Sequence, residues 1–447
     1  MKIIRGFKTE LDPNDRQRTA LLQHAGTARF AYNWGLERKI EARKNGEKNP
    51  SAMELHRELN ALKQTEFPWM YESSKCAPQE ALRDLDRAFA NFFRNCKQKK
   101  KGKKGFPRFK SRRNGIGSFR LTGSIHASET HVSLPRIGAV RLKEHNYLPT
   151  SDVKVLSASI SERAGRWFVS LQVEIESQDH HWQKDEEHPI IGLDLGIKTL
   201  AVCSDGTEFE NPKALGRNLR KLRRLNRSLH RKVKGSSNRR KAAKRVARLH
   251  WRISNIRSDT LHKITTELTR AKSAIVIEDL NVKGMMANRH LSRAISDLGL
   301  YEMRRQLEYK GIWNGCQIIT ADRFFASSKT CSDCGAVNQA LTLSDREWVC
   351  VACGCVHDRD LNAAVNLEHW GVDALLAASS AESQNARGGE GSGSSFGCCE
   401  TNSGEAGIRH ETEAVGGPLF LLTESISVGS EERSGWSVST SPGSRSS

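Results

Sequence analysis

The stretch from Ile190 to Val202 constrains the fold most, because it places a carboxylate within an apolar run. Asp194 lies between Gly192 and Gly196, among β-branched and aliphatic residues that are typical of a buried strand. A carboxylate is costly to bury unless it is paired or binds a metal. Glycines in a strand let another backbone, or a nucleic-acid strand, come close. The stretch therefore predicts a strand that carries an acidic metal site.

Three interpretations of this stretch stay open on its residues alone. The Asp194-Leu-Gly196 core resembles the phosphate loop of actin-like ATPases, which usually continues with small hydroxylated residues, whereas this chain has Ile197 and Lys198. It also resembles the catalytic strand of an RNase H-like nuclease. Alternatively, Asp194 merely caps a turn. Features elsewhere in the chain decide between them.

Net charge indicates the class of partner. The 447 residues carry +20, and such an excess points to a polyanion, most often nucleic acid. Residues from 376 onward include nine acidic and four basic side chains, so the preceding part carries about +25. This Gly/Ser-rich tail is predicted to be disordered.

Hydropathy predicts no membrane partner. No apolar run reaches the roughly 18 residues that a membrane span needs. Residues 1–5 lack the apolar core of a secretion signal. We therefore expect a cytoplasmic protein.

A basic loop at residues 97–113 is predicted to contact nucleic acid. Phenylalanines alternate there with Lys and Arg, while Gly and Pro prevent a continuous helix. That mixture suits phosphate contacts and base stacking, although a merely solvated charge run is the alternative. The predicted contact residues are Lys103, Lys104, Phe106, Arg108, Phe109 and Lys110.

A second basic segment, residues 211–258, holds 18 Lys or Arg and no Asp or Glu. Aliphatic residues recur at helical spacing on both sides of a break at 235–238, which predicts a helical hairpin. An exposed helix normally mixes both signs of charge, so we expect this hairpin to bind phosphates. The predicted contacts are Arg220, Arg224, Arg231, Arg240 and Arg248.

Two cysteine pairs predict a structural zinc site. Cys331-x-x-Cys334 and Cys350-x-x-Cys353 are separated by fifteen residues, enough for a hairpin. Four thiolates satisfy tetrahedral zinc and close its coordination shell. Cys355 or His357 could compete as ligands. Disulfide pairing and an iron–sulfur cluster stay open as well.

Three acidic positions predict a Mg²⁺ site. They are Asp194, Glu278 at the end of the apolar strand 274–280, and Asp358 or Asp360 just after the cysteines. Two Mg²⁺ ions about 4 Å apart can activate water and stabilise the leaving oxygen in phosphodiester cleavage, and such hard cations prefer carboxylates.

Further elements follow from local patterns. Residues 2–11 predict a strand that joins a β module at 116–177, with the intervening helices as an insertion. Residues 77–93 and 292–310 each predict one helix, and 316–320 a strand. A helix is expected to start near Asp358–Asp360, with Asp358 as its N-cap and Asp360 free to face the other acids.

Taken together, the motifs make the chain resemble TnpB, also called OrfB, a transposon-encoded relative of type V CRISPR effector nucleases. The matching motifs span about residues 1–370 in the family's order. They are Tyr32-Asn-Trp34, Gly105-Phe-Pro-Arg-Phe-Lys110, Gly192-Leu-Asp-Leu-Gly196, Ile277-Glu-Asp-Leu-Asn281, Asp322-Arg-Phe-Phe-Ala-Ser-Ser-Lys-Thr-Cys-Ser332, the cysteine pairs and Asp358-Arg-Asp-Leu-Asn-Ala-Ala364.

The resemblance implies an α/β fold, with a RuvC-like (RNase H-like) nuclease, an inserted zinc ribbon and a β-barrel wedge module interrupted by a helical recognition module. The implied segments are 1–13, the first wedge strand; 14–115, the recognition module; 116–186, the rest of the wedge; 187–330, the nuclease with the 211–258 hairpin; 331–356, the ribbon; 357–376, the last nuclease segment; and 377–447, the tail.

The resemblance also implies the activity. A transposon-derived guide RNA would direct cleavage of double-stranded DNA beside a short adjacent motif, by one protein copy with its RNA. Asp194, Glu278 and Asp360 match the family's catalytic positions. A transposase that joins DNA strands, or a regulator that binds DNA without cutting it, remains an alternative.

Overall fold

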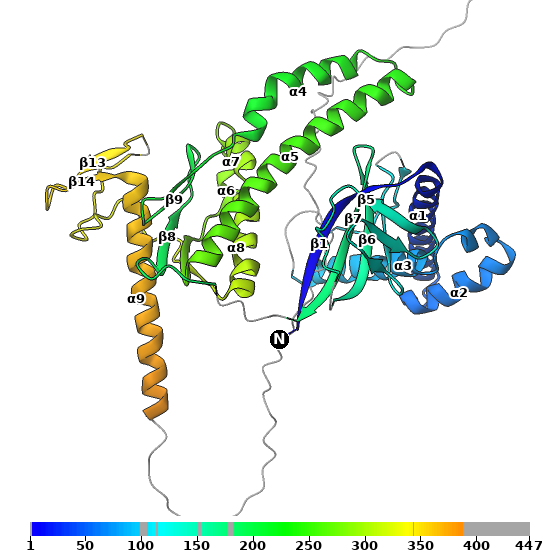
Figure 1. The fold of residues 1–447 in the computed structure, drawn as a ribbon, viewed down its shortest axis with the longest axis horizontal. Coiled ribbons are helices and arrows are strands. Elements are labelled where there is room, and N and C mark those ends of the chain that lie inside the picture. Colours follow the sequence, from blue (N-terminus) through cyan, green and yellow to red (C-terminus); the bar gives the residue numbers. More distant parts are fainter. Residues whose placement is uncertain are drawn as a thin grey trace, which may run out of the picture. The chain divides into compact units, whose positions relative to one another are not determined.

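The computed structural model describes residues 2–98, 105–112, 115–150, 153–176, 182–342 and 344–387. Within these ranges the fold is mixed α/β, with a seven-stranded first sheet, a five-stranded second sheet and a two-stranded hairpin (Figure 1). Residues 388–447 lie outside the described part, so the predicted disorder of the tail stays a prediction.

The first sheet has the order β2-β6-β7-β1-β5-β4-β3. The N-terminal strand β1 pairs along its length with β7 and, at Leu11 and Leu142, with β5, so the predicted membership of this strand is confirmed. The bounds are β1 Lys2–Asp12, β2 Ser118–Leu121, β3 His126–Ala127, β4 His131–Leu134, β5 Gly138–Leu142, β6 Lys154–Arg163 and β7 Arg166–Glu176.

The helices between β1 and β2 share a core with this sheet, made by apolar faces such as Leu36, Leu82 and Leu171. Asn14 caps the first helix through a capping box with Gln17, which is why the chain turns into a helix directly after β1. The bounds are α1 Asp15–Lys44, α2 Ala52–Thr65, the short 3₁₀ helix η1 Pro68–Glu72 and α3 Cys76–Lys97, which contains the predicted helix 77–93.

The second sheet has the order β10-β9-β8-β11-β12. Its bounds are β8 Ile190–Asp194, β9 Thr199–Cys203, β10 Glu208–Glu210, β11 Ala274–Glu278 and β12 Gln317–Ala321. β8 is antiparallel to β9 but parallel to β11, and β11 is parallel to β12.

Two predicted elements were wrong in extent. The stretch 190–202 folds as two strands rather than one, because the backbone turns at Gly196, whose N–H donates to the Leu200 carbonyl at 3.3 Å. The single helix predicted at 292–310 is broken by Gly299, whose φ of +76° is a left-handed conformation suited to glycine.

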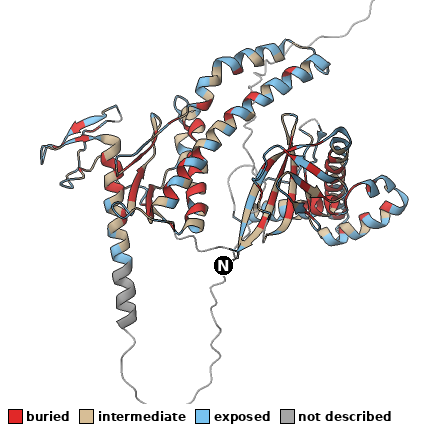
Figure 2. Cartoon of the chain, in the orientation of Figure 1, coloured by how far each residue is buried: buried red, intermediate tan, exposed pale blue. Residues whose placement is uncertain are grey.

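The predicted basic hairpin is confirmed as α4 Ala214–His230 and α5 Ser237–Ala271. Helices α6 Val282–Met285, α7 Ser292–Leu298, α8 Leu300–Asn314 and α9 Arg359–Arg387 complete the described part. Apolar residues of α5, α7 and α8, including Leu261, Leu298 and Leu307, are buried with those of the second sheet (Figure 2). No helix among the described residues is both long and apolar enough to cross a membrane.

Helix α9 lies against the second sheet at two glycines (Figure 1). A Cβ on Gly192 of β8 would clash with the Ala364 carbonyl and lie 2.7 Å from the Glu368 nitrogen, both on α9. A Cβ on Gly371 of α9 would likewise overlap Val276 of β11. Helix backbone therefore occupies the space that the glycine beside Asp194 leaves free. Since α9 extends to Arg387, the predicted boundary at 376 lies inside the helix.

We predict that Gly192→Ala lowers the thermal unfolding midpoint, because α9 must move away from the sheet. Overpacking of this kind costs about 1–3 kcal/mol. Gly6→Ala is the matched control, since Gly6 is an exposed strand glycine with nothing within 4 Å of an added Cβ. Equal midpoints for the two variants would show that the α9 contact is not tight.

Candidate catalytic centre and zinc ribbon

Two of the predicted acids end neighbouring parallel strands. Ile277 of β11 aligns with Leu193 of β8, so the next residues, Glu278 and Asp194, lie at the same edge of the sheet. Each acid is the last residue of its strand. The carboxyl ends of parallel strands are where α/β sheets commonly bind ligands.

The third acid comes from the first turn of α9. Asp358 Oδ1 accepts hydrogen bonds from the backbone N–H groups of Asp360 and Leu361, both at 2.9 Å. That is the N-cap role predicted for Asp358, and it leaves the Asp360 carboxylate to other partners. The predicted start of the helix is also confirmed, since α9 begins at Arg359.

The pKa of Asp194 is influenced by the other two predicted acids. Burial, and then the negative charges of Glu278 and Asp360, raise the pKa of Asp194 to about 7, against a smaller opposing effect of Arg359. Like charges have this effect only at short range. Glu278 and Asp360 are therefore near Asp194, and we call these three residues the acidic site; their role as one metal site stays a prediction.

Two partners of the acidic site were missed by sequence reasoning. Ser327 Oγ donates to Glu278 Oε1 at 2.6 Å. Arg346 Nη1 lies 3.2 Å from both Asp360 oxygens. Ser327 belongs to the 322–332 motif and Arg346 lies between the cysteine pairs, but both are far from β8 and β11 in sequence, so no local pattern linked them to the acids.

The donor chemistry of the acidic site suits a hard divalent cation. The carboxylates of Glu278 and Asp360 repel that of Asp194, and this repulsion favours a bound positive charge. Their oxygens are not all gathered within 4.8 Å of one another among the described residues. Asp194, Glu278 and Asp360 would hold the ion.

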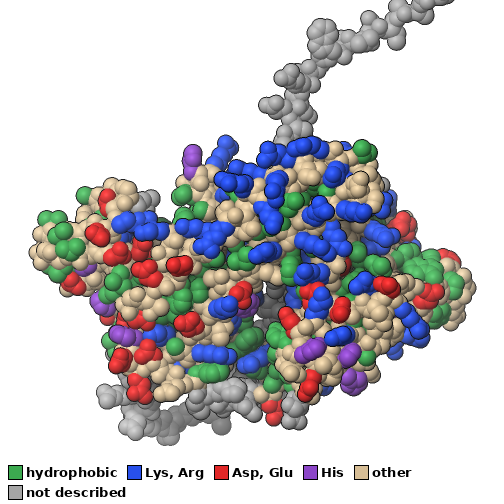
Figure 3. Space-filling view, turned by 45° about the horizontal axis from the view of Figure 1, so that its top comes forward, with side chains coloured by type: hydrophobic (Ala, Val, Ile, Leu, Met, Phe, Trp, Pro, Cys, Tyr) green, Lys and Arg blue, Asp and Glu red, His purple; other side chains and the backbone are tan. Residues whose placement is uncertain are grey.

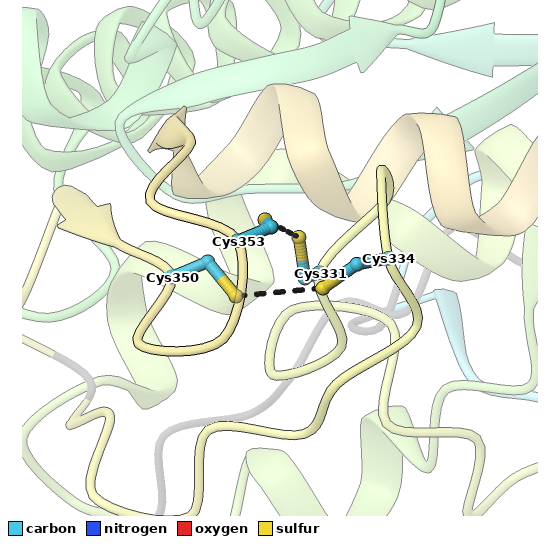
Figure 4. A group of neighbouring side chains, drawn as sticks. All are labelled: Cys331, Cys334, Cys350 and Cys353. Carbon is cyan, nitrogen blue, oxygen red and sulfur yellow. Dashed lines mark hydrogen bonds between the residues drawn. The ribbon is translucent and has the colours of Figure 1, made fainter.

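The four predicted cysteines converge on one point. The Sγ atoms of Cys331, Cys334, Cys350 and Cys353 all lie within 4.8 Å of one another. The Sγ atoms of Cys331 and Cys353, and those of Cys334 and Cys350, are each 3.6 Å apart. Figure 4 shows the four side chains pointing toward one another, with these two pairs joined by dashed lines. The separation exceeds a disulfide bond and matches thiolates around one tetrahedral ion. This cluster, with the hairpin β13 Glu347–Val349 and β14 Val356–Asp358, forms the ribbon.

His357 lies beside the cluster rather than in it. Its Nε2 is 3.0 Å from Cys331 Sγ, and its ring stacks 4.9 Å from Trp348. Cys331, Asp333 and His357 form a second possible ligand group that shares Cys331 with the first. The arrangement suits a hydrogen bond from His357 to a zinc-bound thiolate.

The ribbon is fastened to α9 by two asparagines. Asn362 Nδ2 donates to the Thr330 carbonyl at 2.8 Å, and its Oδ1 accepts from the Ser332 nitrogen at 3.0 Å. Asn366 Nδ2 donates to the carbonyls of Ser327 and Thr330, at 2.8 and 2.7 Å. These contacts explain the Asn in the Asn-Ala-Ala run, while Ala364 allows the close approach to Gly192.

The basic hairpin exposes its charge. Leu222, Leu249 and Ile253 are buried between α4 and α5. The predicted contact residues are all exposed: Arg220, Arg224, Arg231, Arg240 and Arg248. Figure 3 shows Lys and Arg side chains gathered over the upper part of the face that it draws, whereas Asp and Glu are frequent in the lower part. That exposure is what phosphate contacts require.

In the basic loop, the described residues contact the helical block. Phe106 packs edge-on against Phe89 and Phe92, with ring centroids 5.6 and 5.3 Å apart. Lys110 Nζ lies 3.8 Å from the Tyr32 ring, and partial burial lowers the pKa of Lys110.

Asn33 exchanges hydrogen bonds with the Lys110 backbone, so the loop joins the Tyr-Asn-Trp motif. Arg108 and Phe109 are exposed, whereas Lys103 and Lys104 lie outside the described residues. No contact of this loop with nucleic acid is tested, so its predicted role stays a prediction.

Comparison with family models defines the class of protein. Residues 170–289 match the OrfB family of IS605-type elements, described as "Probable transposase", and residues 301–367 match the Cas12f1-like TNB domain. Residues 1–48 match the helix-turn-helix domain of OrfB. The class is that of OrfB-type proteins of transposable elements.

Individual relatives show the family. A "Putative RNA-guided DNA endonuclease" of Streptomyces pristinaespiralis is 38% identical, over 83% of this chain and 90% of the relative. InsQ of Escherichia coli K12, which carries the same description, is 34% identical over 82% of this chain and 92% of its own length. The chain therefore belongs to the OrfB/TnpB family, and the resemblance seen in the sequence is confirmed.

A solved structure supports the fold. Cas12f1, in a cryo-EM complex with guide RNA and target DNA, matches with a TM-score of 0.51, covering 82% of this chain and 99% of Cas12f1. The sequence identity is 14%, so this likeness concerns the fold alone.

We predict that Cys331→Ser loses bound zinc, since a small ribbon has little core of its own. Cys355→Ser is the matched control, because Cys355 is outside the four-cysteine group. This variant should keep its bound zinc. Elemental analysis of the purified variants measures the difference. Zinc retained by the first variant and lost by the second would reassign the ligands.

Proposed function

We propose that this protein is an RNA-guided DNA endonuclease encoded by a transposable element. It cleaves double-stranded target DNA beside a short adjacent motif, using a RuvC-like acidic site and a guide RNA from the element. The observation that carries the proposal is the gathering of Asp194, Glu278 and Asp360 in a chain that shares 38% identity with a relative named for that function.

The second sheet would be the RNase H-like core of this nuclease. Its strands β8, β9 and β10 are successive antiparallel neighbours, and β11 and β12 add in parallel on the other side of β8. The first sheet would be the wedge module, α1 to α3 the recognition module, and the cysteine hairpin a zinc ribbon inserted before the last helix.

The residues of the acidic site divide the work of phosphodiester hydrolysis. Asp194, Glu278 and Asp360 would hold Mg²⁺, which would supply activation of water and stabilisation of the leaving oxygen. Ser327 orients Glu278 by its hydrogen bond, and Arg346 orients Asp360. Asp194 is half-buried at the end of β8, and this partial burial strengthens the interactions of its carboxylate with nearby charge.

The basic hairpin would contact the guide–target duplex through its phosphates. Recognition of the target sequence belongs to base pairing, so the protein needs contacts to backbone and shape rather than to bases. The exposed arginines of α4 and α5 supply such contacts. One protein copy with its RNA is the proposed active unit.

We predict that Asp360→Ala abolishes Mg²⁺-dependent cleavage while RNA and DNA binding persist, because one of three metal-binding carboxylates is lost. Asp358→Ala is the matched control two residues away. Losing an N-cap costs about 1 kcal/mol of stability, so this variant should melt earlier and retain part of its activity.

The measurement is cleavage of a matched target by both purified variants with their guide RNA. Full activity of the Asp360 variant would show that Asp360 is not a catalytic residue. A correctly folded Asp358 variant without activity would exchange the two roles.

We predict that replacing Arg220 and Arg224 by Gln weakens nucleic-acid binding and flattens its salt dependence. Each lost phosphate contact reduces the log–log slope by about 1. The charge-matched control replaces Arg38 and Arg87, which are already paired with carboxylates. Fluorescence anisotropy between about 50 and 200 mM salt gives both slopes. An unchanged slope in the first variant would exclude these two contacts.

Strand transfer is the second candidate, because the family model that matches residues 170–289 is described as a transposase. The two functions differ in their products and in their need for RNA. Hydrolysed DNA ends that appear only with a guide complementary to the target support the endonuclease. Joined element and target strands, formed without RNA, would support the transposase instead.

A further inference from the structure

The loop after β12, residues 322–330, is anchored at the acidic site. Ser327 donates its hydrogen bond to Glu278, and Phe325 packs with its ring 6.5 Å from that of Trp370 on α9. Arg323 forms an ion pair with Asp279, the residue after Glu278. Alternate side chains of the loop, at 323, 325 and 327, thus contact the end of β11 or α9.

Phe324 is the exception within this loop. It lies between the anchored residues Arg323 and Phe325, and the turn is closed by a hydrogen bond from the Phe325 nitrogen to the Asp322 carbonyl at 3.0 Å. Phe324 is 93% exposed, although folding normally buries most of the surface of a phenylalanine side chain. A single exposed aromatic residue is unremarkable on most surfaces. This one is distinguished by its position on a loop that is fastened to Glu278.

Two arginines bind the same carboxylate next to this loop. Arg304 of α8 and Arg323 both bind the Asp279 carboxylate, with Arg304 Nη1 2.9 Å from Asp279 Oδ1. Their side chains nevertheless remain 37% and 54% exposed, so each guanidinium can still meet solvent or phosphate. An exposed aromatic ring next in sequence to Arg323, with Arg304 on the same carboxylate as Arg323, offers the stacking and phosphate contacts that bind single-stranded nucleic acid.

We propose that Phe324 is a stacking platform for one base of a single DNA strand close to the acidic site, with Arg304 and Arg323 contacting its phosphates. The inference rests on the proposed function, because it supplies the DNA. Bases in a duplex stack on one another, so their faces are inaccessible to protein. A DNA strand displaced by pairing of its partner with the guide exposes these faces. Stacking would fix the strand close to Glu278 without reading its sequence.

The test measures binding alone, so it does not depend on cleavage. The guide-loaded full-length protein is titrated, in buffer without Mg²⁺ and without a chelator, against single-stranded DNA that lacks complementarity to the guide and carries 2-aminopurine at successive positions. The variants are Phe324→Ala, Phe324→Leu and Phe324→Trp. Their thermal unfolding should match that of the parent, because the ring is exposed.

The expected loss follows from stacking energies. Phe324→Ala should weaken binding about 5- to 150-fold and remove 2-aminopurine quenching at one position. Phe324→Leu should behave like the Ala variant, and Phe324→Trp should bind at least as tightly as the parent. Unchanged affinity in the Ala variant would overturn the proposal, and full binding by the Leu variant would overturn stacking as its basis. A protein that binds in this way but cuts no guided target would refute the proposed function alone.

Discussion

The acidic site depends on the close approach of α9 to β8. Gly192 lets the Ala364 backbone approach the strand that ends in Asp194, and Gly371 lets α9 approach β11. The helix thereby brings Asp360 to two acids that lie far before it in sequence. No side chain larger than hydrogen fits at Gly192 without moving backbone atoms, so packing determines the position of α9 on the sheet. The glycine is therefore required by the fold, and a passing nucleic-acid strand is not needed to explain it.

Gathering three carboxylates costs free energy, and the surrounding structure offsets part of it. Burial, and then repulsion by Glu278 and Asp360, raise the pKa of Asp194. Arg346 and Ser327 each engage one of the other acids, and both belong to the segment around the ribbon. Asn362 and Asn366 fasten that segment to α9. A structural zinc at the four cysteines would thus stabilise the side chains that orient Glu278 and Asp360, although it lies outside the acidic site.

Local patterns predicted what depends on local sequence. The cysteine spacing, the three acids and the N-cap role of Asp358 could be inferred because each is encoded within a few residues. Arg346, Ser327 and the asparagines of α9 could not, since their partners are brought near by tertiary structure. The helix predicted across Gly299 failed for a related reason: the apolar period continues through the glycine, and its left-handed backbone breaks the helix. Similarly, the apolar run 190–202 concealed a turn at Gly196.

Anomalous diffraction from crystals of the guide-loaded protein soaked in Mn²⁺ would show directly whether the acidic site is a metal centre. Mn²⁺ prefers the same oxygen ligands as Mg²⁺ and can be located by its own scattering. We expect manganese bound by Asp194, Glu278 and Asp360, and its loss in Asp360→Ala crystals. Manganese held elsewhere, or carboxylates that stay apart with no metal between them, would contradict this assignment.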